Sequence, residues 1–120
     1  MKIFFVIVLV LNLLLEGMAG VGLLLGPDGI EATVMPATGM WAMNYGFAAL
    51  AIASAIIWLW PNRTNSQAVG SVMGMLSTFH VLLAISMAIP GNQMGPMIAH
   101  SVMAVLCVVA LTQRNKWCDG

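Results

Sequence analysis

The chain has 120 residues, of which 61% are hydrophobic and only 7% are charged, and its formal net charge is zero. A soluble domain normally carries about 25% charged residues on its surface, so the solvent of this chain is expected to be lipid. Zero net charge gives no basic patch for a nucleic acid. Cys107 and Cys118 form no spaced metal motif or disulfide framework. We therefore expect one all-α membrane domain over residues 1–120.

Four apolar segments are long enough to cross a bilayer as helices, which takes roughly 17–25 residues. The predicted spans are 3–25, 40–60, 68–89 and 95–111, followed by a polar tail over 112–120. Glycine, proline and asparagine separate them, as in the stretch 26–29 and in 90–92. The first span begins like a signal peptide at Lys2, but its apolar run continues to Leu25, so a retained helix is expected.

The basic residues set the expected orientation. Lys2, Arg63, Arg114 and Lys116 all fall at one membrane side of this four-span layout, while the loop acids Asp28 and Glu31 fall at the other. Cytoplasmic segments carry the excess of lysine and arginine. The pattern predicts an inner-membrane protein that crosses four times with both termini in the cytoplasm.

Ionisable and amide groups inside a span are costly and are functional candidates. The spans contain Asn12, Glu16, Asn44, His80 and His100, and each shares a helix face with small residues. These stripes are Asn12, Glu16 and Gly20; Asn44, Ala48, Ala51 and Ala55; Ser77, His80 and Ala84 beside Gly70 and Gly74; and His100, Ala104 and Cys107. Small residues mark close helix contacts in membranes, so a polar cluster inside a four-helix bundle is expected.

The rise of about 1.5 Å per residue gives the expected depths. Glu16 lies roughly 20 Å and His80 roughly 18 Å from the inner face, so these two are expected to meet. Asn44 and His100 each lie about 8 Å below the outer face. The cluster has three readings: a structural pair that locks two helices, a site that binds a ligand or handles protons, and an oligomer contact.

Two metal-based cofactors fit the composition in part. Haem uses imidazole ligands, but His80 and His100 are expected to differ in depth by about 5–6 Å, which is against a shared ring. Met94, Met97, His100 and Met103 recur at spacing three, and thioether with imidazole suits Cu(I). Methionine is also an adaptable packing residue, and no cofactor is assigned.

The end of the first span, Gly20-Val21-Gly22-Leu23-Leu24-Leu25-Gly26-Pro27, together with the length and four-span layout, resembles small bacterial membrane proteins grouped around the DoxX family. The resemblance implies a bacterial inner-membrane protein, often an accessory in a redox context. It carries over no functional residue.

No motif for a nucleophile, a phosphate loop or a metalloprotease is present, so nothing supports an enzyme. The expected function is a non-enzymatic accessory subunit that docks on other membrane proteins, or on itself, along its helices. The alternative is a protein that binds or transports a small molecule, proton or ion through Glu16, Asn44, His80 and His100. A second alternative is a redox subunit that holds haem or quinone.

Overall fold

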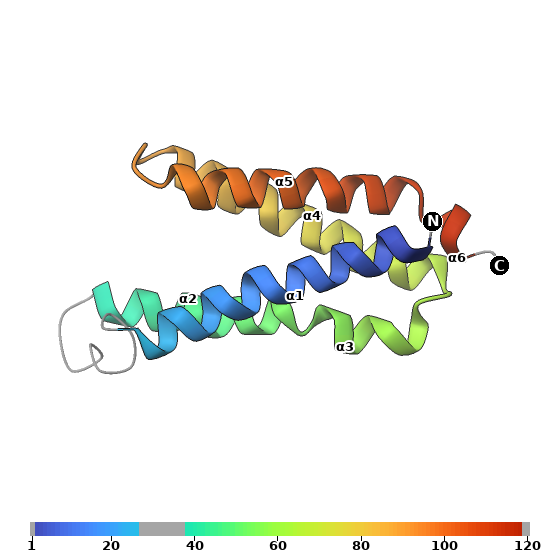
Figure 1. Ribbon diagram of the computed structural model, residues 1–120, viewed down its shortest axis with the longest axis horizontal. Coiled ribbons are helices and arrows are strands. Elements are labelled where there is room, and N and C mark those ends of the chain that lie inside the picture. Colours follow the sequence, from blue (N-terminus) through green and yellow to red (C-terminus); the bar gives the residue numbers. More distant parts are fainter. Residues whose placement is uncertain (1, 27–37, 119–120) are drawn as a thin grey trace. The chain divides into compact units, whose positions relative to one another are not determined.

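The computed structural model describes residues 2–26 and 38–118, and these residues are helical apart from short connections (Figure 1). The elements are α1 (Lys2–Leu25), α2 (Thr38–Ala53), α3 (Ala55–Leu59), the 3₁₀ turn η2 (Trp60–Asn62), α4 (Ser66–Ala88), α5 (Met94–Thr112) and α6 (Asn115–Cys118). The prediction of an all-α chain is confirmed.

Among the described residues, four stretches are long and apolar enough to cross a membrane. They are Lys2–Leu25, Trp41–Asn62, Ser66–Ala88 and Met94–Thr112, so each predicted span coincides with an apolar helical stretch to within two residues at each end. The loop 26–39 lies largely outside the described residues, and so do the predicted outer acids Asp28 and Glu31.

Local chemistry sets the helix ends. The side chain of Asn65 accepts hydrogen bonds from the backbone N–H groups of Gln67 and Ala68. This N-cap starts α4 two residues earlier than predicted. α4 ends before Pro90, which cannot donate a backbone hydrogen bond, and the loop then turns at Gly91 with φ of 71°, a conformation that glycine adopts without steric cost.

The chain divides into two compact units, Met1–Leu9 with Trp58–Gly120, and Val10–Ile57. The first contains α4, α5, α6 and the first turns of α1. The second contains the rest of α1 together with α2. Each unit is described by itself below.

In the unit 10–57, α1 and α2 approach closely at two glycines. A Cβ added to Gly20 would lie 2.8 Å from the carbonyl oxygen of Gly46 and 2.8 Å from Leu50 Cγ. A Cβ added to Gly46 would lie 2.9 Å from Leu24 Cγ. Small residues allow such approaches between membrane helices, so Gly20 and Gly46 determine how closely α1 packs on α2.

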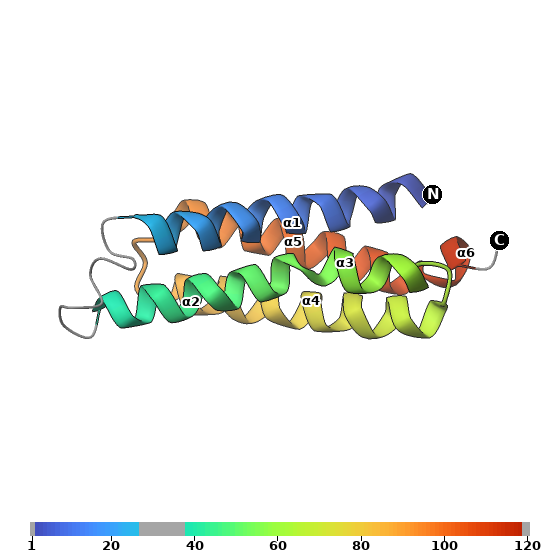
Figure 2. The same cartoon turned by 90° about the horizontal axis from the view of Figure 1, so that it is seen from below.

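The second span is interrupted at Ser54, between α2 and α3 (Figures 1 and 2). The Ser54 hydroxyl donates to the Ala51 carbonyl at 2.7 Å. The backbone N–H of Ile57 donates to the carbonyl of Ser54, three residues earlier, in place of the usual fourth residue. Asn12 Nδ2 on α1 donates to the Ile52 carbonyl at 3.1 Å. A serine hydroxyl that donates to a nearby carbonyl competes with the backbone hydrogen bonds of the helix. The Asn12 amide donates to a second carbonyl beside the same interruption.

The face of α2 that was predicted to contact other helices is largely exposed. Asn44, Ala48 and Ala51 are exposed, and only Ala55 of that stripe is buried. The buried small residues of this span are instead Gly46, Ala49, Ala53 and Ala55. The prediction assumed that Asn44 lies on the buried face of α2. The buried face is instead the one that contains Gly46, where α1 approaches closely.

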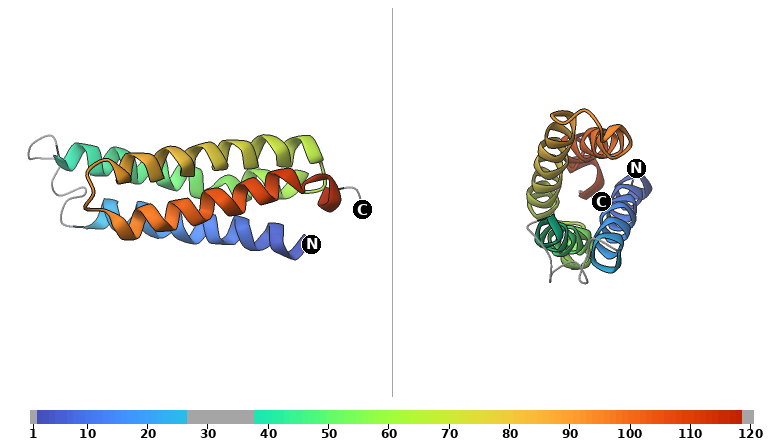
Figure 3. Two further views of the ribbon diagram at one scale, coloured as in Figure 1. Left: turned by 90° about the horizontal axis from the view of Figure 1, so that it is seen from above. Right: turned by 90° about the vertical axis from the view of Figure 1, so that its left-hand side faces the viewer.

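In the other unit, α4 and α5 lie side by side and are joined by the short loop 89–93 (Figures 1 and 3). Val69, Met73 and Leu76 of α4 and Cys107 and Ala110 of α5 are fully buried. Of the two glycines expected to pack here, Gly70 faces the Arg114 side chain, whose Nε would lie 3.0 Å from an added Cβ. A Cβ on Gly74 meets no described atom within 4 Å, so Gly74 marks no close helix contact.

The predicted polar tail is partly folded. α6 covers residues 115–118, and Trp117 and Cys118 are buried. The Trp117 ring packs on Phe4 and Phe5, with ring centroids 5.7 and 5.8 Å apart. Cys118 Sγ donates to the Arg63 carbonyl at 3.7 Å. Aromatic burial fixes α6 on the first turns of α1.

We expect Gly20→Ala to destabilise the protein by about 1–3 kcal/mol, because the new methyl group overpacks the contact with Gly46 and Leu50. Gly17→Ala is the matched control, since its Cβ meets no described atom within 4 Å. Thermal unfolding of both variants in the same detergent measures the difference. Equal midpoints for the two variants would refute the close approach of α1 and α2.

We expect Asn12→Leu to cost about 0.6–1.7 kcal/mol, the range of hydrogen bonds between membrane helices, because the bond to the Ile52 carbonyl is lost. Asn44→Leu serves as the control, since Asn44 is exposed, and should stay within about 0.5 kcal/mol of the parent protein. Equilibrium unfolding in mixed micelles reports both changes. A loss of the same size at Asn44 contradicts the assignment.

Candidate functional site

The acidic and imidazole side chains described inside the spans are buried. Glu16 and His80 are 0% exposed and His100 is 4% exposed. Glu16 follows Asn12 by one turn and precedes Gly20 by one turn, and all three are buried on one face of α1. Glu16 belongs to the unit 10–57 and the histidines to the other unit, so the predicted pairing of Glu16 with His80 stays a prediction.

His80 and His100 contact each other directly. Their Nδ1 atoms lie 3.0 Å apart, and the ring planes make an angle of 33°. A separation of 2.7–3.2 Å is that of a hydrogen bond from a nitrogen donor, so one ring donates through Nδ1–H and the other accepts at Nδ1. The site is a buried imidazole–imidazole hydrogen bond between α4 and α5.

The observed ends of α4 and α5 give the two histidines a smaller difference in depth than the sequence predicted. His80 lies eight residues before the last residue of α4, and His100 lies six residues after the first residue of α5. The offset is therefore two residues, about 3 Å on the helical rise. Side chains that lean along the helices span this distance, and the two rings meet.

Neighbouring side chains enclose the pair. Phe79 packs edge-on against both rings, with centroids 5.3 Å from His80 and 6.4 Å from His100. Ser77, one turn before His80 on α4, is buried, and its hydroxyl donates to the Met73 carbonyl at 2.7 Å. Ala104 and Cys107 continue the buried face of α5 after His100, and Ala84 on α4 is half-buried. An aromatic and aliphatic wall thus limits the water that reaches the rings.

The sequence interpretation missed Phe79 and Gly46. Phe79 adjoins His80 in the chain, and an aromatic residue beside a buried histidine is the signal that could have indicated it. Gly46 belongs to a run of small residues that includes Ala49 and Ala53, which could have indicated the packing face of α2.

The contact also bears on a metal between the rings. Metal–imidazole bonds of about 2.0–2.1 Å hold two nitrogens of a tetrahedral ion about 3.3 Å apart, and those of a linear or trans pair about 4 Å apart. The 3.0 Å separation of the Nδ1 atoms is shorter than both distances, so the geometry fits a shared proton and does not fit a haem iron held in trans between these two atoms. Of the methionines considered for Cu(I), Met103 is buried whereas Met94 is exposed, so they do not share one face.

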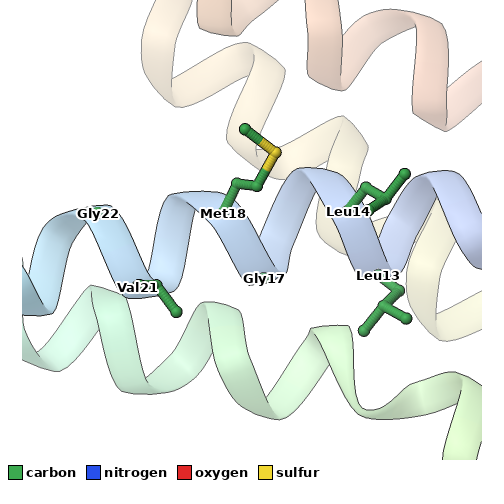
Figure 4. A pocket seen from close by; sticks show the side chains of 6 residues that line it. All are labelled: Leu13, Leu14, Gly17, Met18, Val21 and Gly22. Carbon is green, nitrogen blue, oxygen red and sulfur yellow. The ribbon is translucent and has the colours of Figure 1, made fainter.

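A groove of about 470 Å³ lies on another face of α1. Figure 4 shows the residues that line it, which are Leu13, Leu14, Gly17, Met18, Val21 and Gly22. All come from one helix and none has a polar side chain. The groove offers hydrophobic contact alone, so among the described residues the polar chemistry of α1 is concentrated on the face of Asn12 and Glu16.

Comparisons with known protein families, with curated proteins and with solved structures gave no match for this chain. The resemblance to the DoxX group therefore stays a prediction, and the function is argued from the site.

We expect nitrogen-15 NMR of histidine-labelled protein at neutral pH to show one protonated and one unprotonated Nδ1, coupled to each other across the hydrogen bond. The physical reason is that a 3.0 Å contact requires one donor and one acceptor. His100→Gln should abolish the coupling. Two rings of the same tautomer without coupling would contradict the pair, and Ser101→Ala, at an exposed neighbour of His100, should leave the spectrum unchanged.

Proposed function

We propose that this is a multi-pass membrane protein, with both termini cytoplasmic, whose buried histidine pair takes up and passes on protons within the membrane. The observation that carries the proposal is the 3.0 Å contact between His80 Nδ1 and His100 Nδ1. Ionisable groups at membrane depth are costly, and they mark proton relays and ligand pathways.

The chemistry of the pair supports a relay. In the neutral pair one ring donates Nδ1–H and carries a lone pair on Nε2, while the acceptor ring carries its proton on Nε2. A proton that binds the donor's Nε2 makes that ring an imidazolium. Its Nδ1 proton can then cross to the second ring, which releases its own Nε2 proton. One proton enters at one ring and one leaves from the other, and the two tautomers exchange.

The geometry limits the pair to one added charge. If both rings were imidazolium ions, both Nδ1 atoms would carry hydrogens and neither could accept the hydrogen bond. Two like charges at this distance in a low-dielectric environment would also repel strongly. The pair therefore changes its charge by one proton while its hydrogen bond stays intact, which a single histidine in an apolar wall does not offer.

Glu16 enters the proposal through the sequence. Counting along the helices places this carboxyl at the depth of His80, and we assign it as the group that exchanges protons with the pair. Ser77 and Asn12 have bonds to backbone carbonyls, which favours structural roles for both. Asn44 is exposed and is left out of the relay.

An accessory role in a larger assembly is compatible with the same histidine pair. The open apolar groove on α1 supports this second proposal, because it presents Gly17 and Gly22 on a face without described neighbours for an added Cβ. Native mass spectrometry of the gently extracted protein reports bound subunits directly, and a relay within a complex would retain both properties.

We expect the purified protein in liposomes to carry protons when a potassium diffusion potential is imposed, as read by a pH dye inside the vesicles. His80→Gln and His100→Gln should each lower the flux by about tenfold or more, since glutamine cannot pass a proton. Ser101→Ala, next to the pair but exposed, should leave the flux within twofold, an order-of-magnitude margin for a neutral surface change.

Equal flux in the parent protein and both histidine variants would refute the relay. Glu16→Gln separates the two parts of the proposal. If the flux is lost in the histidine variants but retained in this one, the pair acts without Glu16, and the assigned partner is wrong.

A further inference from the structure

A second polar site lies at the end of the unit that contains the first turns of α1, the turn η2 and α6 (Figure 1). A cavity of about 250 Å³ there is lined by the basic residues Lys2 and Arg63, by Thr64 and Val6, and by the aromatic residues Phe5, Trp60 and Trp117. Its lining combines basic, hydroxyl-bearing and aromatic residues, and it shares no residue with the histidine pair.

One residue that lines the cavity has a buried N–H group without an acceptor. Trp117 is 4% exposed, and its indole Nε1–H has no hydrogen-bond acceptor among the residues that the structure describes. A buried polar group without a partner costs roughly 1–3 kcal/mol. An acceptor that reaches Nε1 would remove this cost, so Trp117 favours a ligand with hydrogen-bond acceptors over an apolar one.

The charges indicate the sign of that ligand. None of the described residues that line the cavity is acidic. Arg63 uses one of its nitrogens, Nη1, on the Trp60 carbonyl at 2.9 Å and places its guanidinium 4.9 Å from the centre of the Trp60 ring. These contacts hold the cation in place and leave further N–H donors. The cavity therefore presents fixed donors and two positive charges to an anion.

The position of the site indicates where the anion comes from. Tryptophan side chains gather at the membrane–water interface, and Trp58, Trp60 and Trp117 come from this end of the unit. A cavity of about 250 Å³ is below the roughly 300–1,000 Å³ of sites for drug-sized ligands and suits a small group. Arginine and lysine are the residues that proteins use for phosphate.

We propose that this cavity binds the phosphate group of an anionic phospholipid, with Lys2 and Arg63 pairing with its charge and Trp117 Nε1 donating a hydrogen bond. Phe5 and Trp60 would contact the glycerol and the first acyl carbons. The contact of Cys118 Sγ with the Arg63 carbonyl ties α6 to the opposite wall, so the site is formed before the lipid enters.

The test is native mass spectrometry of the full chain in detergent, titrated with phosphatidylglycerol or with phosphatidylcholine of the same acyl chains. We expect the anionic lipid to bind at least about fivefold more tightly, and Arg63→Gln to reduce its affinity by about fivefold, the effect of one cation near an anionic surface. Lys116→Gln is the matched control, because Lys116 is exposed at the same end of the chain and does not line the cavity.

Trp117→Phe keeps an aromatic ring on Phe4 and Phe5 but removes the N–H donor. It should weaken the binding of phosphatidylglycerol while leaving the thermal midpoint without lipid unchanged or higher, because the unpaired donor is gone. Equal affinity for the two lipids, or an equal loss in Lys116→Gln and Arg63→Gln, would overturn the proposal. Displacement of the lipid by inorganic phosphate at equal concentration would also overturn it, since a free anion would then be the ligand.

Discussion

A polar group inside a bilayer has no water to bond with, so it must find its partner within the protein. This constraint accounts for the polar contacts found in the spans. Ser77, Thr78 and Ser101 each donate a hydroxyl to the carbonyl four residues earlier in the same helix. Asn12 reaches a carbonyl on the next helix, and the two histidines bond each other. The short hydroxyl side chains thus bond within their own helix, whereas the longer asparagine and histidine side chains bond between helices.

Three means of joining helices therefore operate in the described residues. Glycines bring α1 and α2 into close contact, an amide links the same two helices through a carbonyl, and imidazoles link α4 to α5. Only the last can change its charge. A leucine pair of similar volume would pack α4 on α5 without polar groups, as replacement of buried polar pairs by apolar residues often shows. Packing of α4 on α5 alone therefore does not require imidazole side chains at these two positions.

The sequence predicted the spans because hydropathy and length are properties of each segment alone. It also indicated the buried faces of α1 and α5, where a polar residue and small residues coincide at a spacing of three or four. It failed on α2, where Asn44 lies on the exposed side of a helix near its end. Periodicity gives the residues that share a face but not which face meets a neighbour. Near the interruption at Ser54, the carbonyl of Ile52 accepts a hydrogen bond from Asn12 on another helix, which a single segment does not reveal.

The partners within the candidate site were harder to predict than its members. His80 and His100 were identified as buried groups, yet counting from the span ends gave them different depths. A shift of one or two residues at a helix end moves a side chain by about 1.5–3 Å along the membrane normal, which is the whole difference between contact and separation here. The folded end of the chain was missed because a four-residue helix carries no periodic pattern, and α6 forms through the burial of Trp117.

The contact of Trp117 with Phe4 and Phe5 also has a consequence for the order of folding. The two phenylalanines precede every other span in the chain, and the tryptophan follows all of them. During synthesis the first helix is therefore made with part of its aromatic surface uncovered, and that surface is covered only after the residues that follow the fourth long helix have been made. Because the chain is made from its N-terminus, α6 is the last helix to form, and it completes the packing around the first turns of α1.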